Sequence, residues 1–184
     1  GFLDFYLGTG EPEYHNLMPN TMYHNKQGER FVDVTMAGRF GHLQKGHAVV
    51  FADLDNDGDQ DVFEQLRGAY PGDRFYDAFF ENPGFENNWV AINLIGTQSN
   101  RAAIGTRIRV VITENGVERS IYRYVNSGGS FGANPLMQSI GIGAAERIDA
   151  VEIFWPATGR TQVIRDLPCN QTFRFVEGQN RQPS

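Results

Sequence analysis

The residues from position 53 to position 61 are the part of this sequence whose side chains could most directly do chemistry. Aspartates occupy every second position, and a glycine, Gly58, lies between the third and the fourth of them: Asp53, Asp55, Asp57, Asp59 and Asp61. If this stretch were a flat strand, all five carboxylates would point to one face and repel one another. The chain must therefore curl at the glycine, or a cation must neutralise the charges.

Calcium is the cation that this pattern fits best, because it takes about six to eight oxygen ligands in a flexible geometry. The pattern predicts one ligand from the Asp59 backbone carbonyl, with the Asp59 side chain pointing to solvent, and side-chain ligands from Asp53, Asp55, Asp57 and Asp61. Magnesium would retain more water, and zinc would need His or Cys, which this stretch lacks. A solvated acidic turn without a metal is the remaining alternative.

The spacing from Asp53 through Gly58 to Glu64 also satisfies the EF-hand pattern, so the flanking residues must separate the two kinds of site. An EF-hand needs a helix on each side of its loop. Residues 48–51 read Ala-Val-Val-Phe, which is typical of a strand, and glycines and a proline follow soon after Glu64. The flanks favour a loop between two strands.

The elements that position this loop recur along the chain at one constant interval. The separation of Gly1 from Gly58 is also the separation of Asp4 from Asp61 and of Asn25 from Asn82. A repeat interval of this length suits a four-stranded propeller blade with long loops. Gly1 then corresponds to the glycine of an acidic loop, so the sequence is expected to start inside a repeat. We therefore expect about one and a half blades, with an open blade edge, from the C-terminal part of a larger propeller protein.

After Gly96 the repeat gives way to a series of short strands. Strands are predicted at residues 89–95, 106–113, 117–125, 148–154, 161–164 and 172–176. The dipeptide Asn115-Gly116 is a strong hairpin signal between two of these strands. Gly141 and Gly143 favour a tight turn or a β-bulge, because a dinucleotide site would need a third glycine and a helix.

The expected fold class is therefore all-β, without a convincing helical period anywhere in the chain. Partial β-propeller blades are predicted over residues 1–95, and a small β-sandwich-like domain over residues 96–178. Residues 179–184 form a polar tail.

Composition excludes several classes of function. The net charge of −6 argues against nucleic-acid binding, which needs a basic surface. A membrane span is not expected, because the sequence has no run of about 20 apolar residues. A single cysteine, Cys169, excludes an internal disulfide framework. Trp89 and Trp155 are predicted to be core residues, with a carbohydrate platform as the alternative.

No catalytic set emerges from the sequence. The histidines show no metal-site spacing, and the acid/base candidates are limited to Asp77, Glu81 and Glu86. The sequence gives no reason to choose among these three carboxylates. An enzyme is therefore not expected.

Two sets of residues resemble known families. Residues 51–61 resemble the calcium loop of FG-GAP/VCBS-type repeats. Residues 20–25 and 31–35 resemble the sequence motifs that lie between such loops. The second half resembles the ASPIC/UnbV domain of the cartilage acidic protein family. That resemblance is carried by residues 96–101, 103–107, 128–131, 140–143, 155–156 and 170–171. The turn after Trp155-Pro156 is one residue longer than is usual in the family.

The resemblance implies a secreted or surface protein with a calcium-stabilised propeller and a C-terminal β-domain, and it implies no reaction. The expected function is a calcium-binding adhesion or assembly module, located outside the cell, at the cell surface or in the periplasm. Its expected partner is a protein or a glycan. The alternative is a subunit or accessory domain of an extracellular enzyme that acts on glycans or lipids.

Overall fold

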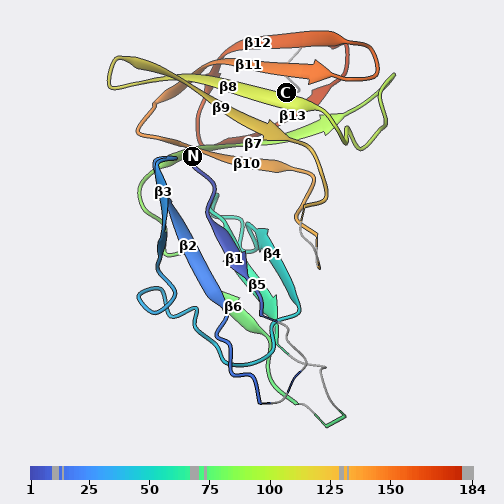
Figure 1. Ribbon diagram of the computed structural model, residues 1–184. Helices are drawn as coiled ribbons and strands as arrows, with labels where there is room; N and C mark the ends of the chain where they lie inside the picture. The colour runs from blue at the N-terminus through green and yellow to red at the C-terminus, as the bar shows by residue number, and fades with distance from the viewer. Residues whose placement is uncertain are drawn as a thin grey trace.

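The computed structural model describes residues 1–9, 13, 15–66, 71–72, 74–128, 131 and 133–179. Within these residues the chain forms strands and turns and contains no helix, so nothing in this part could span a membrane as a helix. The predicted all-β fold is confirmed. Figure 1 shows a group of short strands from the first half of the chain below a larger group of long strands from the second half.

The first half forms two antiparallel three-stranded sheets. One sheet has the order β1-β2-β3, with bounds Phe5–Leu7, Thr21–Lys26 and Arg30–Asp33. The other has the order β4-β5-β6, with bounds Ala48–Ala52, Asp61–Gln65 and Ala78–Phe80. The acidic residues 53–60 connect β4 to β5, so the flanks of the loop are strands, as predicted.

The repeat interval relates the two sheets at the level of single hydrogen bonds. Asp4 Oδ1 accepts the N–H of Asn25 at 2.7 Å, and Asp61 Oδ1 accepts the N–H of Asn82 at 2.9 Å. The Asn25 and Asn82 side chains donate to the carbonyls of Leu3 and Gln60, which are separated by the same interval. The predicted repeat is therefore confirmed as a structural repeat, in which β1 corresponds to β5 and β2 to β6.

The blades pack through one face of each sheet. Alternation along the strands directs Tyr6 and Met22 of the first sheet towards Val62 and Phe80 of the second, and together they form a small core. The opposite face of the first sheet carries a stacked pair, Phe5 on Tyr23, with ring centroids 4.7 Å apart. The opposite face of the second sheet carries Phe63 and the half-exposed Phe79. Each blade therefore has two apolar faces, and only one of them is covered by the other blade.

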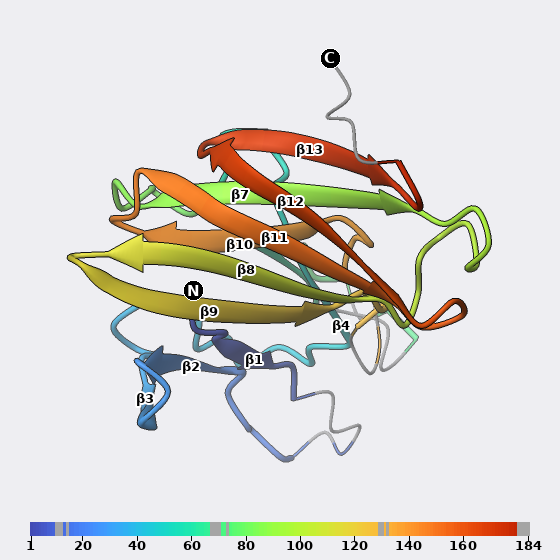
Figure 2. The same ribbon diagram turned by 90° about the horizontal axis from the view of Figure 1, so that it is seen from above.

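The second half is a sandwich of two sheets. One sheet has the order β10-β7-β13, with bounds Gln138–Gly143, Asn88–Ile95 and Gln171–Val176. The other has the order β12-β11-β8-β9, with bounds Arg160–Pro168, Arg147–Trp155, Arg107–Glu114 and Val117–Tyr124. Figure 2 shows these long strands from above. The predicted sandwich-like domain is confirmed.

The strands of the sandwich follow the predicted signals. The hairpin between β8 and β9 turns at Asn115 and Gly116, whose positive φ angles of 52° and 78° suit a type I′ turn. The register between β10 and β7 shifts between Gly141 and Gly143, in agreement with the irregularity expected at these glycines. The two sheets enclose a large apolar core between them. Trp155 lies in this core and is buried, so its assignment to the core is confirmed.

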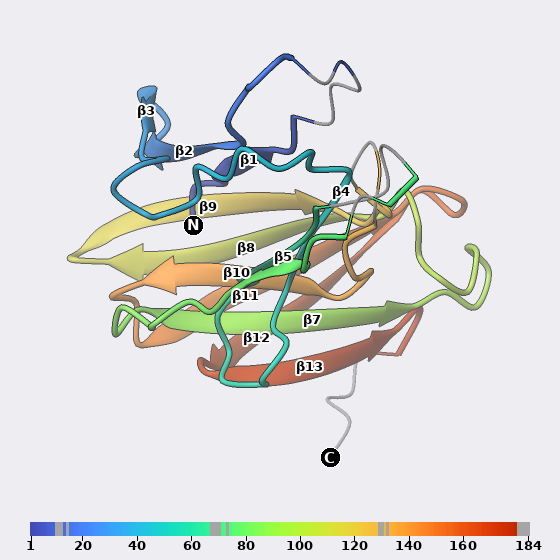
Figure 3. The same cartoon turned by 90° about the horizontal axis from the view of Figure 1, so that it is seen from below.

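The two halves of the molecule meet without a long linker. The predicted boundary followed residue 95, but β7, which ends there, pairs with β10 and β13, so the change of packing falls between β6 and β7. The N–H groups of Val49 and Phe51 donate to the Phe131 carbonyl at 3.2 Å and to the Asn134 side chain at 3.0 Å. The sandwich thereby occupies the free edge of β4. Figure 3, seen from below, shows β4 and β5 in front of the sandwich strands.

Some predicted segments lie partly or wholly outside the described residues. Residues 129–130 of the motif at residues 128–131 are among them, as are residues 180–184 of the tail.

The C-terminal end of the sandwich is held by the carboxylate of Glu177. Its Oε2 accepts three successive backbone N–H groups, and its Oε1 accepts the Ser99 hydroxyl at 2.9 Å and the Thr158 hydroxyl at 3.3 Å. The backbone donors are Thr97, Gln98 and Ser99, at 2.9, 2.8 and 2.7 Å. These bonds favour the charged form and lower the pKa of Glu177 to about 2, although burial acts in the opposite direction. The last strand is therefore tied to the loop that follows β7 by charge-assisted bonds.

We expect Glu177→Gln to lower the free energy of unfolding at pH 7 by about 2 kcal/mol, because charge-assisted hydrogen bonds are stronger than neutral ones. Because the pKa of Glu177 is lower in the folded state than in the unfolded chain, its carboxylate stabilises the fold at pH values above about 4.5. This contribution is lost as the pH falls through about 2. The variant should therefore lose less stability than the parent between pH 4.5 and 2, measured by urea unfolding. Exposed Glu146→Gln is the matched control. Equal acid slopes in the two proteins would contradict this role for Glu177.

Candidate metal centre

The acidic loop spans the ends of two antiparallel strands. Ala52, the last residue of β4, pairs with Asp61, the first residue of β5, so the intervening residues form a closed loop on a rigid base. Within it, the carboxylate oxygens of Asp53, Asp55 and Asp57 converge, with one atom of each lying within 4.8 Å of the others. The loop thus brings together three of the four side chains that the sequence assigned as metal ligands.

Backbone N–H groups hold these carboxylates in place. The N–H of Asp57 donates to Asp53 Oδ1 at 3.1 Å and to Asp55 Oδ1 at 3.2 Å, and the N–H of Gly58 donates to Asp53 Oδ2 at 3.1 Å. The N–H of Asp59 donates to Asp57 Oδ1 at 3.1 Å. Each oxygen retains a further lone pair, so the same carboxylates can also face a cation.

Gly58 lets the loop turn against the sandwich. Its φ of +101° is unfavourable for any L-residue, and a Cβ built on it would lie 2.1 Å from the indole Cε2 of Trp89. Trp89 lies on β7 and is partly buried, so it is a packing residue at the junction of the two halves. The sequence suggested a glycine for the turn, but the close approach of Trp89 was not predicted.

Asp61, the first residue of β5, is not part of the converging group and has a structural role of its own. Only 1 % of the residue is exposed. Its Oδ2 accepts the N–H of Leu54 at 3.0 Å, while its Oδ1 accepts the N–H of Asn82. It therefore ties the start of the loop to the segment after β6. The same bond in the other repeat, from Asn25 to Asp4, shows that this arrangement belongs to the blade and does not depend on a complete acidic loop.

The side chain of Asp59 differs from its prediction. It was expected to point to solvent, but its Oδ1 is buried and has no hydrogen-bond partner. Desolvation and the nearby charges of Asp57, Asp61, Asp55 and Asp53 raise the pKa of Asp59 to about 6. The crowding of negative charge that the sequence suggested is therefore present in the folded loop.

Glu64 lies outside the acidic loop, which excludes the EF-hand alternative. It would be the twelfth residue of an EF-hand loop, yet it lies within β5 and is fully buried. The hydroxyl of Tyr6 donates to its Oε2 at 2.6 Å, while its Oε1 has no hydrogen-bond partner. Burial raises the pKa of Glu64 to about 7, although the Tyr6 hydrogen bond acts in the opposite direction. Glu64 therefore contacts the other blade, through the hydroxyl of Tyr6.

Comparisons with known families agree with this architecture. Residues 1–64 match the FG-GAP-like repeat family, and residues 96–182 match the family described as ASPIC and UnbV. A search of curated proteins gave no match. The first part of the chain therefore resembles an FG-GAP-like repeat and the second part an ASPIC/UnbV domain, as predicted from its motifs. This pair of domains indicates an extracellular or cell-surface interaction module, because FG-GAP-like repeats typically occur in extracellular proteins.

Proposed function

We propose that this protein is a calcium-stabilised adhesion or assembly module located outside the cell, at the cell surface or in the periplasm. The observation that carries the proposal is the convergence of Asp53, Asp55 and Asp57 in a loop between two strands of an FG-GAP-like repeat, a repeat that commonly binds Ca²⁺. Asp61 and the Asp59 carbonyl complete the proposed ligand set. Hard oxygen donors in this number suit calcium better than zinc or magnesium.

Calcium would act on structure at the junction of the two halves. Without a cation, the folded state must hold neighbouring carboxylates together against their repulsion, and the raised pKa of Asp59 reflects that cost. A bound cation would remove the repulsion and fix the loop that carries Gly58 against Trp89. Calcium would thereby stiffen the contact between the blades and the sandwich.

We expect calcium at about 100 times its dissociation constant to raise the free energy of unfolding by roughly 2.7 kcal/mol, because only the folded loop gathers the ligands. The measurement is the melting temperature in excess calcium and in chelator, for the parent and for Asp55→Ala. The control, Glu118→Ala, removes an exposed carboxylate from β9, far along the chain from the loop. The rise should disappear in Asp55→Ala and persist in the control. A rise that survives Asp55→Ala would place the calcium site elsewhere.

The apolar outer faces of the blades support the assembly role. Phe5 and Tyr23 on one blade and Phe79 on the other are only partly covered, and exposed apolar surface of this kind marks contact sites. The alternative role beside a glycan- or lipid-acting enzyme gains no support from the proposed acid/base residues. Glu81 and Glu86 are exposed, and Asp77 accepts the backbone N–H of Leu66. We therefore propose no catalytic role.

A further inference from the structure

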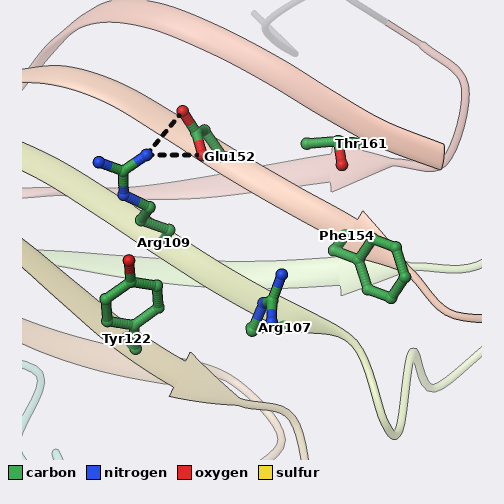
Figure 4. A pocket seen from close by; sticks show the side chains of 6 residues that line it. All are labelled: Arg107, Arg109, Tyr122, Glu152, Phe154 and Thr161. Atoms are coloured by element: carbon green, nitrogen blue, oxygen red, sulfur yellow. Dashed lines mark hydrogen bonds and ion pairs between the residues drawn. The ribbon is translucent and has the colours of Figure 1, made fainter. Parts of the chain in front are cut away.

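The outer face of the four-stranded sheet carries an open hollow of about 240 Å³. Six side chains from all four strands line it: Arg107, Arg109, Tyr122, Glu152, Phe154 and Thr161. Figure 4 shows how they lie over β8, β9, β11 and β12. Guanidinium, carboxylate, hydroxyl and aromatic groups therefore meet in one open hollow, where together they can form hydrogen bonds and ring contacts with a ligand.

Register places these groups in two rows across the sheet. Arg107 pairs with Tyr124 on one side and with Phe154 on the other, and Phe154 pairs with Thr161. Neighbouring strands are about 4.8 Å apart, so a row of four side chains spans about 14 Å, which is the length of a short oligosaccharide. A ligand lying along such a row would touch an aromatic ring, a cation and a hydroxyl in turn.

The second row supplies a pre-positioned polar pair. Arg109 Nη1 donates to both oxygens of Glu152, at 3.2 and 3.1 Å, and Arg109 Nε donates to the Ser120 hydroxyl at 3.0 Å. Beside this pair, Tyr122 is 52 % exposed. A fixed donor and acceptor next to an open aromatic ring suits a ligand whose hydroxyl groups both accept and donate hydrogen bonds.

Arg107 gives the hollow an uncompensated positive charge. Among the described residues it has no carboxylate within ion-pair distance, and its guanidinium lies 5.4 Å from the centre of the Phe154 ring. The lining thus contains two guanidinium groups and one carboxylate, in a chain whose net charge is −6. A ligand with a carboxylate could bind the free face of Arg107 in the bidentate geometry that guanidinium groups favour.

The sheet geometry argues against a peptide as the ligand. Backbone N–H and C=O groups lie in the plane of the sheet, so an extended peptide would pair at a strand edge and could not use its main chain on this face. The two exposed tyrosines, Tyr122 and Tyr124, instead offer flat rings to the apolar faces of sugars.

We propose that this face binds a saccharide that carries carboxylate groups, with Arg107 binding a carboxylate and with Tyr122, Tyr124 and Phe154 supporting the sugar rings. The inference rests on the proposed interaction role, and it names the class of partner. It does not depend on calcium, because the hollow and the acidic loop belong to different sheets.

The test is titration calorimetry of the full chain with tetragalacturonate in a buffer that contains chelator, so that calcium does not link the sugar to the acidic loop. Maltotetraose, a sulfated tetrasaccharide and tetra-aspartate are the comparison ligands. Tetragalacturonate should bind more tightly than all three. Arg107→Gln should weaken its binding at least about tenfold, because the variant loses the charge and the bidentate geometry of the guanidinium contact.

Matched variants keep the result interpretable. Arg174→Gln removes the same charge from an exposed position on β13, in the other sheet, and should leave binding unchanged. Tyr124→Ala, at a position 57 % exposed, should weaken binding without changing the melting temperature. Asp55→Ala should bind tetragalacturonate like the parent, so a failure of the calcium proposal would not change this measurement. The inference is overturned if tetragalacturonate does not bind, if a comparison ligand binds as tightly, or if Arg107→Gln and Arg174→Gln behave alike.

Discussion

Raising the pH from about 4.5 to 8 is expected to lower the free energy of unfolding by about 3 kcal/mol through one side chain, Glu64. Its carboxyl is fully buried between the blades, and its pKa is raised from 4.5 to about 7. Between these two values the folded state holds a proton that the unfolded chain releases. Stability is therefore complete below about pH 4.5 and decreases as the pH rises through about 7.

The surroundings of Glu64 explain why the neutral form is preferred. Its Oε1 has no hydrogen-bond partner, and the space next to it is limited by Gly46, at which a Cβ would lie 2.1 Å from this oxygen. Asn20 Oδ1 borders the same space, 2.8 Å from that Cβ position. A carboxylate here faces another acceptor oxygen, whereas a protonated carboxyl brings a donor. An uncompensated buried charge is the costlier of the two states.

Urea unfolding of the parent and of Glu64→Gln, in chelator at pH 4.5, 6 and 8, measures this effect. The amide cannot ionise, so the difference in stability between the two proteins should change by about 3 kcal/mol across the range. Taking the difference removes the contributions of the histidines and of the acidic loop, which both proteins share. Glu118→Gln, at an exposed position of β9, should show the slope of the parent. A pH-independent difference between the parent and Glu64→Gln would mean that the pKa of Glu64 is not raised in the folded state.

Gly58→Ala is expected to destabilise the protein by about 4 kcal/mol, which combines strain at a positive φ with overpacking. The added methyl would meet the indole of Trp89, and neither group can move freely, because one belongs to the turn and the other to β7. The loop should shift away from the sandwich, so the calcium-dependent rise in melting temperature should also decrease. Chemical unfolding with and without calcium measures both effects.

Two further variants separate strain from overpacking. Gly116→Ala places a methyl at a φ of +78° with no other group within 4 Å, so it reports backbone strain alone. Trp89→Leu removes the indole, and Gly58→Ala should cost about 2 kcal/mol less in that background than in the parent. Additive effects of the two substitutions would show that the added methyl does not clash with Trp89 and that backbone strain accounts for the loss.

Much of the fold could be predicted because its signals are local. The alternation of Ile108, Val110 and Ile112 identified a strand with one buried face, and Asn115-Gly116 identified its hairpin. The repeat interval could be recognised because Asp61 and Asn82 in the second blade make the same hydrogen bond as Asp4 and Asn25 in the first. For the acidic loop, alternation suggested four ligand side chains, and three of them, Asp53, Asp55 and Asp57, converge.

What the sequence could not reveal are contacts between residues far apart in the chain. Tyr6 and Glu64 are separated by 58 residues, and Ser99 and Glu177 by 78, and no periodicity links either pair. The predicted boundary followed residue 95 because the repeat gives way to a different series of strands after Gly96. Only strand pairing shows that β7 belongs with β10 and β13. The exposed row around Arg107 was equally hidden, because it is assembled from four strands.

The two outer apolar faces of the blade pair are different from each other, so the pair has two distinguishable ends. One repeat interval further along the chain, Phe5 and Tyr23 correspond to Val62 and Phe80. In the same way, Tyr6 and Met22 correspond to Phe63 and Phe79. The outward face of each blade is thus the counterpart of a face that is already buried between them. Adding a third blade at either end would repeat the existing contact, whereas a two-fold arrangement would place like faces together and create a different one. Blades added through such a contact would all be oriented in the same direction along the stack. The series would end only where the curvature of the stack brings the outer face of the first blade into contact with the outer face of the last.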